Sequence, residues 1–195
     1  MKRNILARMH NEGLIYCLNK WQGAQRREDI PKLVESLVKE FCESNEIDFE
    51  PFRLPTFTDN LDDLNLINWI NQTTFSDDFK RLVNTTIDIL QQNLDISSTF
   101  IELDSLLTQA ESTLVKNEFT VFDDHIYVAK RSIEFWQSEV NGVILWKLNA
   151  PYLKNLPTRG PINWGKVFCC DCVGGIVGGA AGYLGSSLIS VIMQY

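Results

Sequence analysis

The sequence predicts an all-α protein, an irregular helical bundle of about six helices with a C-terminal glycine-zipper helix or hairpin. Three observations support this class. Apolar residues recur at helical spacing through the first 147 residues, residues that favour helix caps stand before several of these stretches, and no stretch sustains a strict apolar–polar alternation. The expected helices share no repeated signature, so a bundle is favoured over a solenoid.

The first two helices are expected on either side of a polar break at residues 22–27. Asp29 is expected to cap the second helix, with Pro31 in its first turn. Each helix has one apolar face, as a helix packed against a core requires. On the first helix this face consists of Leu6, His10, Gly13, Leu14, Cys17, Leu18 and Trp21, and on the second of Leu33, Val34, Leu37, Val38, Phe41 and Cys42.

Two more helices are expected after an irregular stretch at residues 46–60, which contains two prolines. A short helix covers about residues 61–71. Ser76 is expected to cap the next one, because its hydroxyl can accept a hydrogen bond from a backbone N–H in the first turn.

Ser97 or Ser98 is expected to open another helix, and a last long helix is expected at about residues 120–140. Residues 143–146 have the composition of a short strand, but one strand alone has nothing to pair with. The prediction for the first 147 residues is therefore entirely helical.

Three segments are expected along the chain. Residues 1–147 form an acidic helical domain, residues 148–165 a basic linker rich in proline and glycine, and residues 166–195 a glycine-rich apolar tail. Residues 29–147 carry twenty-two acidic and nine basic side chains, whereas both ends of the chain are basic. This acidic middle argues against a nucleic-acid partner, because binding to phosphates requires a basic face.

The tail is the most distinctive segment. No charged residue occurs between Cys172 and Met193, a run of twenty-two residues. Small residues recur within it at helical spacing, which permits close packing or membrane entry; they are Gly174, Gly175, Gly178, Gly179, Ala181, Gly182 and Gly185. As a helix exposed to water, the six glycines would cost roughly 5–6 kcal/mol relative to alanine. Something must therefore surround this helix.

Three environments would satisfy this requirement. The tail is long enough to span a bilayer, and the basic residues before it would then place the domain in the cytoplasm. Alternatively, it packs as a helix or hairpin in the protein's own core, against a partner helix or in a homodimer. A third possibility is conditional insertion, as in pore-forming or bacteriocin-like proteins, where a stowed tail enters a membrane after release.

Candidate chemistry is sparse. Cys169, Cys170 and Cys172 lack the paired spacing and fourth ligand of a zinc site. The acidic pair before His125 is interpreted as a helix start, and His10 as a core histidine with one hydrogen bond. The glycines do not form a nucleotide-binding pattern. We therefore expect no catalytic residue, cofactor, metal or small-molecule ligand, although an enzyme using His125 with Asp123 or Asp124 stays a minority hypothesis.

Five cysteines without framework spacing indicate a reducing compartment. The charged residues Arg8 and Glu12 interrupt the apolar stretch that export requires, so no cleaved signal peptide is expected. The expected location is the cytoplasm or the cytoplasmic face of the inner membrane.

The segment His10-Asn11-Glu12-Gly13-Leu14, joined to the glycine-rich C-terminus, resembles a group of small bacterial proteins. These uncharacterised proteins pair an HNEGL-type N-terminal helix with a glycine-rich tail. The resemblance covers the two ends of the chain; it implies a bacterial source but no activity and no site residue. The function expected is a non-catalytic helical protein that acts through its tail in membrane association or protein–protein interaction.

Overall fold

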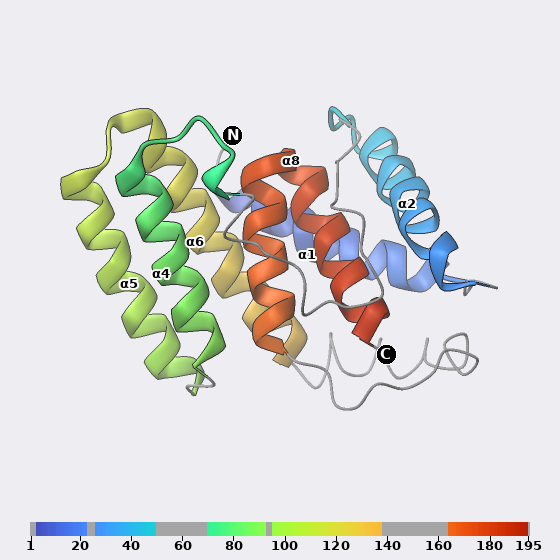
Figure 1. The fold of residues 1–195 in the computed structure, drawn as a ribbon. Coiled ribbons are helices and arrows are strands. Elements are labelled where there is room, and N and C mark those ends of the chain that lie inside the picture. The colour runs from blue at the N-terminus through green and yellow to red at the C-terminus, as the bar shows by residue number, and fades with distance from the viewer. Residues whose placement is uncertain (1–2, 23–25, 50–69, 93–94, 138–163, 195) are drawn as a thin grey trace.

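The computed structural model describes residues 3–22, 26–49, 70–92, 95–137 and 164–194 (Figure 1). Within these ranges the chain is helical and contains no strand, which confirms the predicted all-α class. The helices are α1 (Arg3–Lys20), the 3-10 turn η1 (Arg27–Asp29), α2 (Ile30–Ser44), α4 (Asp77–Gln91), α5 (Ile96–Thr113), α6 (Lys116–Gln137) and α8 (Trp164–Gln194). Most of the expected helix at 61–71, the stretch at 143–146 and most of the expected linker lie outside the described residues.

The helix starts follow local hydrogen bonding, and one predicted cap is confirmed. The Ser76 hydroxyl accepts a hydrogen bond from the backbone N–H of Phe79 at 3.2 Å, so Ser76 caps α4 as predicted. The side chain of Glu118 in α6 accepts hydrogen bonds from the Ser76 backbone N–H and hydroxyl, both at 2.7 Å. This pair of contacts joins the start of α4 to the first turn of α6.

Of two other expected starts, that of α5 is wrong and that of α2 is right in position. Asp95, and not Ser97 or Ser98, caps α5, because its carboxylate accepts from the Ser98 backbone N–H at 3.0 Å. Its two oxygens accept from both the N–H and the hydroxyl of Ser98, which a serine cap cannot do. Asp29 occupies the N-cap position of α2 and Pro31 lies in the first turn, as predicted, but the Asp29 side chain makes no capping hydrogen bond.

The glycine-rich run bends back on itself inside α8. Gly179 has φ 58° and ψ −148°, a conformation that only glycine adopts without strain. The bend divides α8 into two arms that lie side by side, coloured orange and red in Figure 1. Among the described residues, no helix is both long enough and apolar enough to cross a membrane.

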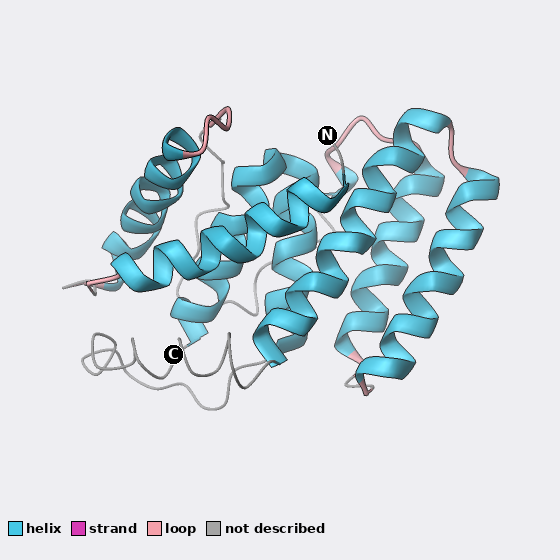
Figure 2. Ribbon diagram, turned by 180° about the vertical axis from the view of Figure 1, so that it is seen from behind, coloured by secondary structure: helices cyan, strands magenta, loops and turns pink. Residues whose placement is uncertain are grey.

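The two arms of α8 occupy the centre of the bundle. They pack against α1, α2, α4 and α6. In Figure 1 the arms lie between α4 and α6 on one side and α2 on the other, and in Figure 2, which is seen from behind, α1 crosses in front of them. The tail is thus surrounded by the amphipathic helices that precede it in the sequence.

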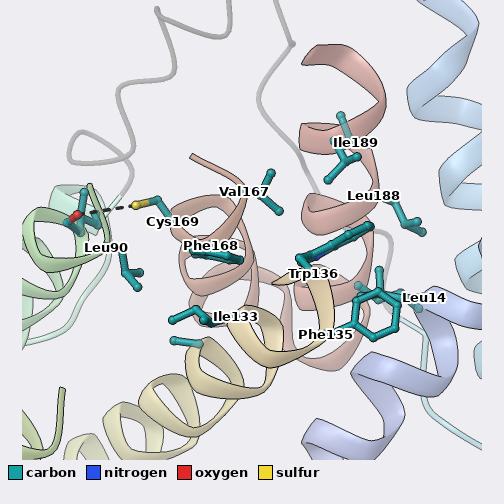
Figure 3. Close-up of a cluster of buried hydrophobic side chains, with 14 of the residues drawn as sticks. Leu14, Leu90, Ile133, Phe135, Trp136, Val167, Phe168, Cys169, Leu188 and Ile189 are labelled. Carbon is teal, nitrogen blue, oxygen red and sulfur yellow. Dashed lines mark hydrogen bonds between the residues drawn. The ribbon is translucent and has the colours of Figure 1, made fainter. Parts of the chain in front are cut away.

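Large side chains from α1, α6 and both arms of α8 meet in this core (Figure 3). Trp136 is fully buried there, and Phe135 contacts it edge to face with ring centroids 5.0 Å apart. Burial of each large apolar side chain contributes about 1.5–3 kcal/mol. The other labelled members are Leu14, Leu90, Ile133, Val167, Phe168, Cys169, Leu188 and Ile189.

Candidate functional site

Three of the glycines singled out in the sequence lie where the two arms of α8 touch. A Cβ atom added to Gly182 would overlap the Gly174 carbonyl, and one added to Gly174 would overlap the Ser186 side chain. A Cβ on Gly175 would overlap the ring of Tyr183. Only hydrogen fits at these positions, because the backbones approach more closely than any side chain permits.

The remaining small residues of the tail have different surroundings. Gly179 is exposed at the bend, with open space around it. Ala181 and Gly185 are buried in the second arm, and Gly178 lies in α8 just before the bend. The small residues of the tail therefore lie in different places: at the contact between the arms, at the bend and in the core. The sequence pattern did not distinguish these places, because it showed only that small residues recur at helical spacing.

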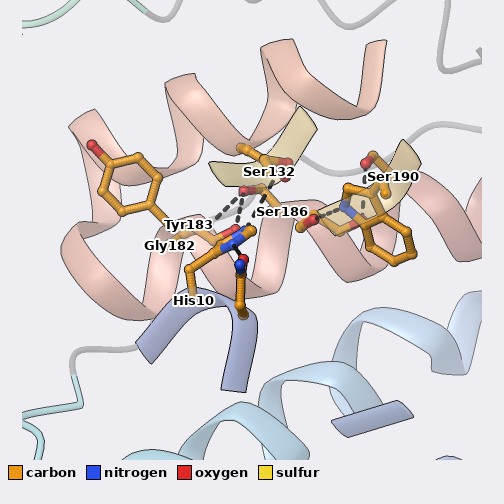
Figure 4. Close-up of polar contacts among 10 residues, drawn as sticks. His10, Ser132, Gly182, Tyr183, Ser186 and Ser190 are labelled. Carbon is orange, nitrogen blue, oxygen red and sulfur yellow. Dashed lines mark hydrogen bonds and ion pairs between the residues drawn. The ribbon is translucent and has the colours of Figure 1, made fainter. Parts of the chain in front are cut away.

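A buried polar cluster connects α1, α6 and both arms of α8 (Figure 4). The Ser132 hydroxyl of α6 donates to Oδ2 of Asp171 in the first arm. The hydroxyl of Ser187, in the second arm, also hydrogen-bonds the Asp171 carboxyl and accepts from the Trp136 indole N–H at 3.0 Å. His10 of α1 completes the cluster, with Nε2 lying 3.7 Å from Asp171 Oδ2.

Burial determines the charges of this cluster. It raises the pKa of Asp171 well above its usual value, although hydrogen bonds from Ser132 and Ser187 act in the opposite direction. Burial also lowers the pKa of His10 from 6.5 to about 4, against the effect of a hydrogen bond to Asn11. At neutral pH His10 is therefore uncharged, and burial favours the protonated, uncharged form of Asp171, because a charge is costly in an interior without water.

The cluster brings together a serine, a histidine and an aspartate, but not in the arrangement of a catalytic triad. In a triad the serine hydroxyl bonds to the histidine, which orients it for attack. Here the hydroxyl of Ser132 donates to Asp171, and His10 donates through Nδ1 to the Asn11 side chain at 2.9 Å. All three members of the cluster are at most 2% exposed, so substrate has no access to them in this conformation.

Sequence reasoning placed His10 correctly but missed the members of this cluster on α6 and α8. His10 is buried with one hydrogen bond, as predicted. Asp171 was considered only as part of the cysteine cluster, and Ser132 was not considered. One signal was available, since Asp171 is the single acidic residue after residue 147 and directly precedes the charge-free run.

Two cysteines of the tail, Cys169 and Cys170, face the interior. Cys169 and Cys170 are free and buried, and the Cys169 thiol donates to the Ile87 carbonyl at 3.7 Å. Burial raises the pKa of both thiols, to about 12 for Cys170, so they stay protonated at neutral pH. Among the described residues, no three metal-binding side chains gather closely enough to hold an ion.

The segment around His125 does not begin a helix, contrary to the sequence interpretation. Helix α6 begins at Lys116, so Asp123, Asp124 and His125 lie in its interior. His125 is fully buried and tilts against the Phe122 ring at 5.7 Å, and Asp123 is 6% exposed. Because α6 starts a turn earlier than expected, its acidic pair is part of the packed helix.

The two most exposed large apolar side chains of the described residues lie on helix α5 and just beyond its end. This helix packs mainly against α4 and α6 and contains three acidic residues but no lysine or arginine. Ile101 is 71% exposed, and Val115, just beyond the helix, is 67% exposed. Sequence reasoning did not single out Ile101, which lies away from the buried side chains Leu103, Leu106 and Ala110 of this helix.

These features define a class of protein: a helical bundle built around a buried, glycine-rich helical hairpin and a central buried polar cluster. Comparisons with protein-family models, with curated proteins and with solved structures find no match.

Proposed function

We propose that the protein is a non-catalytic helical interaction protein that binds a basic partner segment through α5. In this proposal the C-terminal hairpin acts indirectly: it forms the centre of the bundle and supports the outer helices. The surface of α5 is the observation that carries the proposal.

The outward face of α5 combines a strongly exposed isoleucine and a row of hydroxyl side chains with acidic flanks. Ile101, Ser105, Thr108 and Ser112 follow one another at helical spacing and are all exposed. The exposed acidic side chains of this helix lie on both sides of that row; they are Glu102, Asp104 and Glu111. Asp104 is paired with Lys130 of α6 at 2.6 Å, whereas no ion pair is recorded in the described structure for Glu102 or Glu111. A surface of this kind complements a basic amphipathic helix whose lysines pair with the acidic side chains and whose apolar side chains cover Ile101.

The proposal can be tested with a synthetic amphipathic peptide that carries a row of leucines flanked by lysines. We expect saturable binding to the full chain that weakens as salt is added, because the flanking interactions are exposed and screened. The double variant Glu102→Lys, Glu111→Lys should weaken binding at least tenfold, and Ile101→Asp should do the same. Both substitutions are on an exposed surface, so circular dichroism should be unchanged.

Two controls make this test specific. Glu43→Lys reverses an exposed charge on α2, away from the proposed surface, and should leave binding unchanged. A peptide with glutamates in place of the lysines should not bind. If Glu43→Lys weakens binding as much as the α5 variants, the interaction is a general effect of net charge and the proposal fails.

A second candidate is conditional insertion of the hairpin into a membrane. It is favoured by the twenty-two-residue run without charge and by the basic residues Lys154, Arg159 and Lys166 that precede it. Insertion would require the arms to leave the four helices that now cover them. Sedimentation of the full chain with anionic vesicles, followed by a carbonate wash, tests this candidate. Recovery of all the protein in the supernatant, at every pH tried, would reject it.

A further inference from the structure

We propose that His10 and Asp171 form a proton-controlled latch between α1 and the C-terminal hairpin, in which the two uncharged side chains hold one exchangeable proton between them. While the proton is present, α1 docks on the hairpin. When it is lost, the contact opens. This inference is independent of the function proposed for α5.

The geometry identifies a proton acceptor and a proton donor. His10 Nδ1 donates to Asn11, so the neutral ring carries its proton there and Nε2 has an unshared lone pair. Nε2 lies toward the Asp171 carboxyl and has no hydrogen-bond partner among the described residues. Asp171 Oδ1 is also buried without such a partner. The 3.7 Å between Nε2 and Asp171 Oδ2 is longer than a hydrogen bond. In the proposed latch the two side chains close this gap, and a protonated carboxyl supplies the O–H that the buried Nε2 lacks between α1 and α8.

The surroundings of the pair contain few other charges. Asp171 is approached by the hydroxyls of Ser132 from α6 and Ser187 from the second arm. On its own arm, the Cys169 and Cys170 thiols interact with it, and Lys166 interacts with Cys170. On α6, His125 is buried on the same stripe as Ser132, two turns earlier and about 10 Å along the axis. Because both histidines are buried, a measurement of histidine protonation must distinguish His10 from His125.

The number of protons bound in each state determines the pH dependence. When the latch opens, His10 enters water and takes up a proton below its ordinary pKa of 6.5. Asp171 releases a proton above its ordinary pKa of 3.8. Between about pH 4 and 6.5 these changes cancel, so opening is nearly independent of pH. Above 6.5 only the release by Asp171 remains, and opening is favoured about tenfold per pH unit until its raised pKa is reached.

Single substitutions separate the contributions of His10 and Asp171 to this pH dependence. Asp171→Asn leaves only His10, whose pKa is about 4 in the closed form. Its opening constant should rise about tenfold per unit as pH falls from 6.5 to 4, roughly 300-fold in total. His10→Gln leaves only Asp171, so opening should instead rise with pH from about 4 upward. Between about pH 4 and 6.5 the opening constants of the two variants should therefore change with pH in opposite directions, whereas that of the natural chain should be nearly constant.

Native-state hydrogen exchange of the α1 amides measures this opening, with α5 amides as an internal reference. Rates must first be corrected for the intrinsic pH dependence of exchange. Asp88→Asn, which removes an exposed carboxylate on α4, is the matched control and should reproduce the natural profile. A flat profile in Asp171→Asn, or equal slopes in both variants, would overturn the proposal.

Spectroscopy of the natural chain provides a test that does not depend on whether the variants fold. At pH 6 the infrared spectrum should contain the carbonyl band of a buried protonated carboxyl. Nitrogen-15 resonances of His10, assigned through the backbone resonances of the labelled natural chain, should report a neutral imidazole. If His10 is instead protonated and the infrared band is absent, the pair is an ion pair and the proposal is wrong.

Discussion

The indole N–H of Trp136 donates to the Ser187 hydroxyl at 3.0 Å, and this bond ties α6 to the second arm of the hairpin. Ser187 in turn hydrogen-bonds the Asp171 carboxyl of the first arm. Three segments distant in sequence are thus joined by one chain of buried hydrogen bonds, in an interior where such bonds reinforce one another.

Trp136→Phe should reduce the free energy of unfolding by about 1–2 kcal/mol more than a matched tryptophan substitution, because it removes the indole donor from this chain. The match is Trp21→Phe. Trp21 is 4% exposed, and its indole nitrogen has no hydrogen-bond partner among the described residues. Urea unfolding of the two variants gives the comparison. Equal losses would mean that the bond to Ser187 adds nothing beyond packing.

Gly182→Ala should destabilise the protein by about 1–3 kcal/mol, because the new methyl group must displace the backbone of the opposite arm at Gly174. An alanine favours helix more than glycine does, so propensity alone predicts the opposite sign. The melting temperature, measured by circular dichroism, shows whether the clash or the helix propensity has the larger effect. A higher melting temperature would show that the arms are not in close contact at this position.

Gly179→Ala separates backbone strain from lack of space. Nothing lies within 4 Å of the position that a Cβ would take, yet φ is 58° and ψ is −148°. We expect a loss of about 1–3 kcal/mol from the strained backbone alone. Denaturant unfolding of Gly179→Ala and of the double variant with Gly182→Ala measures whether the two costs add. If Gly179→Ala is neutral, the bend is not needed for the fold.

Asp95→Ala should lower the melting temperature, whereas Ser97→Ala should leave it nearly unchanged, because Asp95 makes the capping bond to Ser98. Hydrogen bonds from Ser98 also lower the pKa of Asp95 below its usual 3.8. The stabilisation is therefore complete above about pH 3.8 and is lost as pH falls through the lowered value. Melting curves recorded between pH 2 and 7 should show the two proteins converging in acid. An effect of Ser97→Ala equal to that of Asp95→Ala would contradict the assignment.

Much of the fold was predictable because helical periodicity and capping are local properties. The apolar stripe around Val34 and Phe41 became the buried face of α2, and Ser76 caps α4. The error at the start of α5 arose because Asp95, Ser97 and Ser98 compete for the same N-cap position. The apolar face also identified His10 as a core residue.

The candidate site was much less predictable. Asp171 is adjacent to His10 in space but 161 positions away in the chain, and no local pattern relates them. The serines that bond to Asp171 are common residues in helices, and their role depends on which helix lies opposite. The exposed Ile101 became notable once the buried face of α5 was known.

By itself the sequence determined that the chain is helical and that its glycine-rich end needs close surroundings, because propensity and periodicity act over a few residues. It left membrane, partner and core as alternatives. Only the tertiary structure decided that the chain reverses at Gly179, that the arms meet at Gly174 and Gly182, and that Asp171 lies beside His10. These are properties of helix packing, in which free energy depends on residues that are distant in the sequence and adjacent only after folding.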